Sequence, residues 1–394
     1  MMRTCYVLVA ALAACGGSDA NNPTPDGGSD SSPDAGSGCP RAPAADDRTR
    51  YVVVSHPYDT AGQGADTFEV LELSAAGELT RPTPNRIFSL ARTSFGQIAF
   101  TPDGKIGLVA TEDGKLAVFE LDAAGMPRVI DAGLAGSFYA TRIYVDPRGD
   151  RAYVLDGNTR ENGGGIYRVD INCDGTVVDR GLVAAAKLPG GMALAGNRAI
   201  VAAGDILTGA KAGDDVQLLD WSDTPSLVGG VDAFGDDMAI VGGSALTTDG
   251  MHYLVGDTSA FGDQPNRVEI VDITGTTMTS AGQVLVEDPQ AIAASPFGTK
   301  AIVTSALGDK IFVLAPGATG TWAATEVSYA GGRPQLPGDL AAIDRGTLRG
   351  HVFISENVSI RHLAFTPDGN VTDLGSLAFG MGLENIGGAI GITP

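Results

Sequence analysis

Acidic side chains follow one recurrent type of short apolar segment in this 394-residue chain. The four that stand directly at such a segment's end are Asp156 (after RAYVL), Asp205 (after RAIVAAG), Asp257 (after HYLVG) and Glu356 (after HVFIS). Hard cations take several oxygens from carboxylates, amides and carbonyls. This pattern therefore predicts a metal site, most plausibly for Ca²⁺, built from these carboxylates. No stretch has the DxDxDG spacing of a dedicated calcium loop, so the alternative, solvated side chains that cap local turns, stays open.

A second set of polar residues has the chemistry to contact a ligand. His56 ends the first such segment, three arginines can hold an anionic group, and two amides complete the set. The candidates are His56, Arg92, Arg142, Gln290, Arg333 and Asn385. Each arginine has the alternative role of an ordinary surface charge.

Motifs for covalent hydrolysis are absent. The stretch Gly242-Gly243-Ser244-Ala245-Leu246 lacks the last glycine of a GxSxG nucleophile turn, and there is no HExxH or CxxC. The remaining histidines, His252, His351 and His362, fall inside predicted strands, where a structural role is the simpler interpretation. No set of nucleophile, base and orienting group can be assembled from motifs, which favours a non-enzymatic function.

The apolar segments belong to a repeat of about 50 residues, a period typical of propeller blades. One strand, B, recurs seven times, and a second strand, C, follows each copy; a turn and a weaker strand, D, come next. Strand B reads YVVVS, IGLVA, RAYVL, RAIVA, HYLVG, KAIVT and HVFIS; strand C reads FEVLEL, LAVFEL, IYRVDI, VQLLDW, VEIVDI, IFVLAP and IRHLAF. Turn residues bound each strand, as in QIAFTPDGKIGLVA.

An innermost strand, A, precedes B in six repeats but not in the first. The missing copy is GAIGITP at residues 388–394, which echoes QIAFTP at residues 97–102. The sequence therefore predicts an all-β, seven-bladed β-propeller of four-stranded blades over residues 49–394, closed by the C-terminal strand joining the first blade. B–C and D–A connections emerge on one face of such a ring, so the candidate residues are expected at one mouth of the central channel. Four of the B–C connections are long, which marks this face as the default binding site.

The repeats resemble those of the YVTN/lactonase-like propellers. The resemblance rests on Ile98 to Lys105 (IAFTPDGK), on Ala301 to Val303 (AIV) and on strands C that end in Asp. These residues build a blade, so the resemblance implies the fold and not an activity. Gluconolactonase-like members of the group place a divalent ion at the channel mouth, which is consistent with the carboxylate site above.

The amino-terminal segment reads as an export signal followed by a tether. Residues 1–14 form a lipoprotein signal peptide, and Leu12-Ala13-Ala14-Cys15 resembles a lipobox, which implies lipid attachment at Cys15. Residues 15–48 are rich in Gly, Ser, Asp and Pro and are expected to be a flexible tether. The expected location is the cell envelope, at the outer membrane or facing the periplasm, with the lipid as the sole membrane contact. In that compartment Cys39 and Cys173 can form a disulfide; two unpaired thiols are the alternative.

The net charge of −21 argues against nucleic acid as a partner. The favoured interpretation is a monomeric binding or scaffold module for an envelope protein, a glycan or a small molecule. The alternative is a metal-assisted lactonase or related hydrolase at the channel mouth, and a structural role in the envelope is a third hypothesis.

Overall fold

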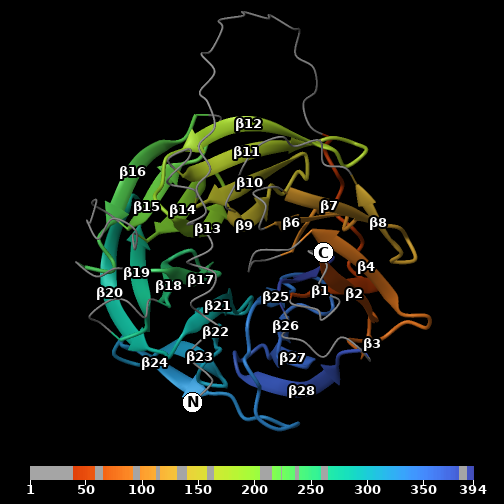
Figure 1. Ribbon diagram of the computed structural model, residues 1–394. Coiled ribbons are helices and arrows are strands. Elements are labelled where there is room, and N and C mark those ends of the chain that lie inside the picture. The colour runs from red at the N-terminus through yellow and green to blue at the C-terminus, as the bar shows by residue number, and fades with distance from the viewer. Residues whose placement is uncertain are drawn as a thin grey trace, which may run out of the picture. The chain divides into compact units, whose positions relative to one another are not determined.

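The computed structural model describes residues 39–57, 65–91, 98–111, 116–130, 140–157, 164–204, 215–222, 224–235, 239–258, 265–380 and 388–394. These residues form seven antiparallel sheets, the blades of a propeller (Figure 1). Within the described part of the chain, no helix is long and apolar enough to cross a membrane.

Each blade has the strand order A–B–C–D from the channel outward, as predicted. The A strands are β29 (Ile390–Ile392), β5 (Ala99–Phe100), β9 (Ala140–Val145), β13 (Pro189–Ala195), β17 (Val241–Leu246), β21 (Pro289–Ala294) and β25 (Leu340–Ala342) for blades 1 to 7. The B strands are β1 (Arg50–His56), β6 (Ile106–Ala110), β10 (Arg151–Asp156), β14 (Arg198–Ala203), β18 (His252–Asp257), β22 (Ala301–Ser305) and β26 (His351–Ser355). The C strands are β2 (Ala65–Leu73), β7 (Leu116–Leu121), β11 (Gly165–Ile171), β15 (Val216–Asp220), β19 (Arg267–Thr274), β23 (Lys310–Pro316) and β27 (Ser359–Phe365). The D strands are β3 (Leu79–Thr80) with β4 (Arg86–Ala91), β8 (Pro127–Ile130), β12 (Val177–Ala184), β16 (Ser226–Val231), β20 (Thr277–Leu285), β24 (Trp322–Glu326) and β28 (Val371–Ala378).

The ring closes through blade 1, where β29 pairs with β1 and confirms the predicted closure (Figure 1). Val52 lies opposite Ile392, and Val54 lies opposite Ile390. Thr393 extends the ladder: its hydroxyl accepts a hydrogen bond from the Tyr51 amide at 2.8 Å, and its own amide donates to the Tyr51 carbonyl at 2.9 Å. Pairing the two ends of the chain removes the sheet edges that an open ring would expose.

The outer strand of blade 1 differs from the sequence prediction of one D strand per repeat. β3 pairs with the end of β2, and β4 pairs with its beginning, so residues 81–85 interrupt the edge. This short insertion carries Arg81, which reaches back into the blade and contributes to the site described below.

The core lies between the blades: one cluster joins Leu108 and Val118 of blade 2 to Val154 and Val169 of blade 3. The B strands are buried along nearly their whole length. Three outer strands each carry a glycine at a register shift: Gly181 in β12, Gly282 in β20 and Gly375 in β28, all at positive φ. Such bulges twist an exposed edge and discourage pairing with another chain.

Glycine pairs bring the inner strands of blades 4, 5 and 6 unusually close. A Cβ added at Gly243 of β17 would lie 2.5 Å from the backbone of Ala291 and Ile292 in β21. A Cβ at Gly191 of β13 would lie 2.3 Å from Ser244 Oγ. Only glycine leaves space for this approach of the strands.

Residues 39–49, the strap, run across the A–B and C–D turns on the face opposite the B–C connections. Cys39 is disulfide-bonded to Cys173 in the C–D turn of blade 3, with an S–S distance of 2.12 Å. Arg41 then pairs with Asp103 of blade 2 at 3.2 Å, and Arg48 donates to the Pro394 carbonyl at 3.2 Å. The part of the expected tether from Cys39 onward is therefore bound to the propeller.

Candidate functional site

The predicted mouth is the end of the ring where B strands finish and A strands begin. In blade 3, for example, Ala140 at the start of β9 lies opposite Asp156 at the end of β10. Asp156 is buried there. The pKa of the Tyr167 phenol is raised, mainly by burial of that phenol and further by the negative charge of Asp156.

Arg142 crosses the channel at this end as a strut between blades. From β9 of blade 3 its guanidinium donates to Asp339 of blade 7 at 3.0 Å, to the Gly242 carbonyl of blade 5 at 3.2 Å and to the Gln290 carbonyl of blade 6 at 3.4 Å. Asp339 in turn accepts from the Ile390 amide of blade 1 at 3.3 Å. Burial alone would lower the pKa of Arg142, but the Asp339 carboxylate raises it overall, so the strut stays charged.

Deeper in the channel, hydroxyl groups surround Gly191. Tyr144 OH accepts from the Met192 amide at 2.9 Å, and Ser244 Oγ lies beside the hydroxyls of Tyr144 and Tyr253. Burial raises the pKa of both phenols, which therefore remain protonated. This layer is polar and uncharged, in contrast to the ionic layer at the mouth.

Blade 5 holds a buried arginine between two carboxylates. Arg267 lies 3.1 Å from Asp257 and 2.6 Å from Glu269. Its Nη2 donates to the Phe234 carbonyl at 3.2 Å, in the connection from blade 4 to blade 5. Burial raises the pKa of Glu269, and the neighbouring arginine opposes that shift.

Blade 7 repeats the arrangement with other residues. Arg361 donates to Glu356 through Nε and to Asp373 through Nη1 at 2.7 Å. Its Nη2 donates to the Gly332 carbonyl at 3.1 Å, in the connection from blade 6 to blade 7. Burial raises the pKa of Glu356, against the lowering effect of Arg361 and Ser359.

Blade 1 uses Arg81 from the insertion in its outer strand. Arg81 pairs with the buried Glu69 and donates to the Ala378 carbonyl at the end of blade 7. His56 Nε2 lies 3.8 Å from Glu69 Oε2, and the His56 ring packs edge-on against Phe379 with centroids 4.5 Å apart. The histidine predicted at the mouth is therefore there, buried within this cluster.

These three arginine clusters share one role. In each, an arginine of one blade hydrogen-bonds the preceding blade, either at its D–A connection (Arg267 and Arg361) or at the last residue of its D strand (Arg81). Backbone strain also occurs in D–A connections, namely those that lead into blades 4, 6 and 7, and the last of these is also held by Arg361. Leu188, Asp288 and Leu336 have positive φ, and each directly precedes a proline. Residues in such conformations persist only where surrounding contacts hold them, and they cluster at functional sites.

The predicted site residues have diverse surroundings. Asp257 and Glu356 are partners of buried arginines, so a cation there would have to displace a guanidinium. Arg142 and Gln290 lie within inner strands rather than in connections, and Gln290 also donates to Asp288 at 2.6 Å. Arg333 is largely exposed and pairs with Glu326 at 3.1 Å. Asp205, Arg92, Asn385 and Cys15 lie outside the described residues. In the described part of the chain, no three His, Cys, Asp or Glu side chains are grouped closely enough to hold a metal, and the calcium site stays a prediction.

Sequence reasoning missed Arg267, Arg361, Glu269 and Asp373. A signal was present, because charged residues interrupt the strand starts RVEIVDI and SIRHLAF at positions that must be half or fully buried. A buried charge requires a partner, so each of these arginines implied a nearby carboxylate.

No protein-family model matches the chain, and no curated protein matches it either. Among solved structures it is similar to a hypothetical selenium-binding protein from Sulfolobus tokodaii, at 11% identity over 89% of this chain and 94% of that one, with a TM-score of 0.62. It is also similar to the periplasmic gluconolactonase of Pseudomonas aeruginosa, at 14% identity over 88% of this chain and 99% of that one, with a TM-score of 0.58. A Bacteroides uniformis protein named as a candidate 6-phosphogluconolactonase matches at 14% identity over 68% and 80%, with a TM-score of 0.50. These likenesses show the architecture: the chain folds as a seven-bladed β-propeller whose structural neighbours include gluconolactonase-like proteins.

Proposed function

We propose that this protein is an exported binding module that presents its B–C and D–A connections, on a rigid ring, to a ligand of the cell envelope. The three arginine clusters carry the proposal. A buried ion pair usually adds no stability over well-packed apolar residues. Three such clusters at one end of the ring, each bonded to an arriving connection or to the strand end from which it starts, are therefore better explained by loop presentation than by stability.

The disulfide supports the export part of the proposal. Such bonds persist in oxidising compartments and are rare in the cytosol. Lipid attachment at Cys15 would then hold the module at a membrane, and mass spectrometry of the membrane fraction tests it. A diacylglycerol-modified Cys15 is the expected result; a chain that still carries residues 1–14, or an unmodified Cys15, would contradict it.

Metal-assisted lactone hydrolysis is the second candidate function. The likeness to a periplasmic gluconolactonase favours testing it. Asp156, Asp205, Asp257 and Glu356 would be the ligands of a Ca²⁺ ion that polarises the lactone carbonyl, although arginines already hold Asp257 and Glu356.

One set of experiments separates the two candidates. Unfolding of the full mature chain is followed in EDTA and then in millimolar Ca²⁺, and sugar and acyl lactones are assayed under both conditions. A ligand that binds the native state alone raises its apparent stability. The binding proposal predicts no calcium-dependent stabilisation and no hydrolysis, whereas turnover that EDTA abolishes and Ca²⁺ restores would establish the lactonase.

Binding itself is measured on an array of envelope glycans and peptidoglycan fragments. Arg361→Leu releases the Gly332 connection, and Arg180→Leu on the outer strand β12 is the matched control. Ligand binding that is weakened by the first variant and unchanged by the second supports the proposal. Equal binding by all three proteins would place the ligand elsewhere on the ring.

A further inference from the structure

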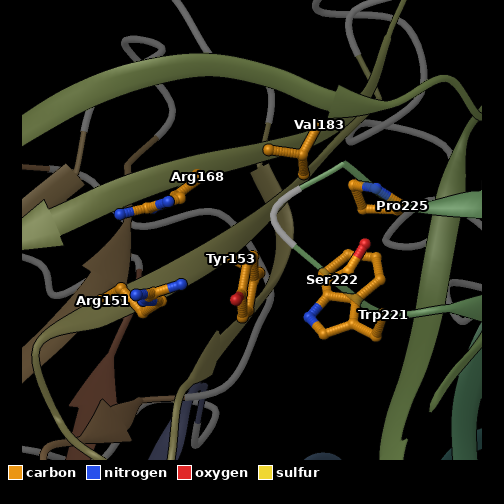
Figure 2. Close-up of a pocket in the computed structure, with 7 residues that line it drawn as sticks. All are labelled: Arg151, Tyr153, Arg168, Val183, Trp221, Ser222 and Pro225. Carbon is orange, nitrogen blue, oxygen red and sulfur yellow. The ribbon is translucent and has the colours of Figure 1, made fainter. Parts of the chain in front are cut away.

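A pocket lies between blades 3 and 4, and Figure 2 shows the side chains that line it. It lies away from the channel mouth, because Arg151 starts β10 and Trp221 directly follows β15, at the A–B and C–D turns of the opposite face. It occupies about 190 Å³ including its opening to solvent. Its walls are Arg151, Tyr153, Arg168, Val183, Trp221, Ser222 and Pro225. Much of this volume is the opening to solvent, so the walled part of the pocket is small. The space suits one functional group rather than a whole sugar.

The repeat shows that one arginine in this pocket is exceptional. Arg168 of β11 pairs with Tyr153, the third residue of β10. At the equivalent position of the C strand, blades 1, 2, 4, 5 and 6 have Val70, Val118, Leu218, Ile270 and Val313. An aliphatic residue at this position fills the space between blades. Blade 3 instead directs a guanidinium there, beside a second one from Arg151 at the start of β10.

Three of the side chains that line the pocket carry N–H donors: Arg151, Arg168 and Trp221. Arg168 uses Nε to bind Asp170 at 2.8 Å, and Arg151 Nε lies 3.5 Å from Asp150. The Arg151 guanidinium also donates to the Tyr153 hydroxyl. The Trp221 Nε1–H group is buried and has no hydrogen-bond acceptor. Figure 2 shows both arginines on one side of Tyr153 and the indole on the other side.

Apolar surface completes the walls. Tyr153 and Trp221 pack edge to face with centroids 4.9 Å apart, and Val183 and Pro225 border them. An indole N–H can only donate, and guanidinium groups match the planar geometry of a carboxylate. A small, planar acceptor that carries negative charge would therefore complement the indole N–H and the neighbouring guanidinium groups.

We propose that this pocket binds a single carboxylate group, with Arg151, Arg168 and the Trp221 N–H as its donors. A short apolar stem on the acid would contact Tyr153 and Val183. The carboxylate can belong to a small organic acid or to the C-terminus of a peptide, because both present the same group. This site is separate from the channel mouth, so its failure leaves the proposed function untouched.

The chain offers a built-in reporter for this site. It has two tryptophans, so Trp322→Phe leaves Trp221 as the sole indole. The full mature chain with this change is titrated with sodium acetate, propionate and benzoate against sodium chloride at equal ionic strength. A saturable change in Trp221 fluorescence with the carboxylates, and none with chloride, is the expected result.

Arg168→Leu introduces the residue that blade 4 has at this position and should fold. Loss of a charged hydrogen bond should weaken carboxylate binding roughly ten- to hundredfold. Arg180→Leu is the matched control, because Arg180 binds the same Asp170 at 2.8 Å but does not line the pocket. It should leave the titration unchanged.

Three outcomes would overturn the proposal: no saturable response, equal weakening by both arginine variants, or sulfate binding at least as tightly as acetate. Broadening of the acetate methyl NMR signal gives a readout independent of tryptophan and is also applied to Trp221→Phe, which should bind acetate more weakly.

A tripeptide with a free C-terminus, compared with its amide, identifies the source of the carboxylate. Tighter binding of the free peptide than of propionate indicates a peptide terminus, and the reverse indicates a small acid.

Discussion

The paired histidines of blade 7 predict how stability should depend on pH. His351 Nδ1 and His362 Nε2 lie 2.8 Å apart and share one hydrogen bond, and His362 stacks on Phe353 with centroids 4.3 Å apart. Burial lowers the pKa of both rings, and the charge of His351 adds to the effect at His362, whose pKa falls to about 4. The folded protein therefore resists protonation at this site.

The sign and size follow from linkage. An unfolded histidine, with a pKa near 6.5, takes up a proton as the pH falls, whereas folded His362 does so only near pH 4. Stability is thus fully retained above pH 6.5 and is lost as the pH falls toward 4. Lowering the pH from 7.5 to 5 should remove about 2 kcal/mol through His362 alone, and His351 acts in the same direction.

Urea unfolding of the wild type and of His362→Gln at pH 7.5 and pH 5 measures this effect. The glutamine cannot titrate but can still hydrogen-bond His351, so the variant should lose about 2 kcal/mol less than the wild type over this range. Titrating groups that do not contact His362 contribute equally to the pH dependence of both proteins, so their effect cancels in the comparison. The same two proteins at pH 7.5 and 8.5 are the control, where the difference between them should not change. Equal pH dependence of the two proteins between pH 7.5 and 5 would refute the assignment of this acid sensitivity to the histidine pair.

Three further changes test other parts of the structure by the same unfolding measurement. Gly243→Ala should lower the free energy of unfolding by about 1–3 kcal/mol, because the new Cβ meets the backbone of β21. The control is Gly298→Ala, where nothing lies within 4 Å of the new Cβ and the loss should be far smaller. Similar losses in the two variants would contradict the close approach of the inner strands. Arg142→Met should lower the free energy of unfolding by up to about 3 kcal/mol, because the largely buried Asp339 loses its cation, and adding Asp339→Asn should recover much of the loss; additive losses would show that the two residues are not coupled. Replacing Cys39 and Cys173 by serine should cost about 2–4 kcal/mol relative to the oxidised protein, and an unchanged unfolding midpoint would mean that the strap adds no stability.

The fold was predictable because its signals are local and repeated. Turn residues such as Thr101-Pro102-Asp103-Gly104 bound each strand, and seven copies of one pattern leave few alternatives to a propeller. The closure by β29 was predictable because one inner strand was missing at the start and present at the end.

The site was only partly predictable, because its contacts join distant parts of the chain. Arg142 and Asp339 are 197 residues apart, and nothing near either one in the sequence indicates the pairing. The sequence pattern places the carboxylates Asp257 and Glu356 at the ends of B strands, but it does not indicate their partners, Arg267 and Arg361, which lie in C strands. The cysteine pairing stayed open for the same reason, since it depends on a Cα separation of 5.0 Å across 134 residues.

The attachment of Cys39 to blade 3 also defines how the ring would bear mechanical load. A pull on the chain ahead of Cys39 passes through the covalent bond to Cys173 and into the turn between β11 and β12. The strap and the β1–β29 pairing lie outside that path, so the seam formed by the two chain ends is shielded from tension. A ring closed by non-covalent pairing of its termini is thus protected from being opened by the segment that leads into it.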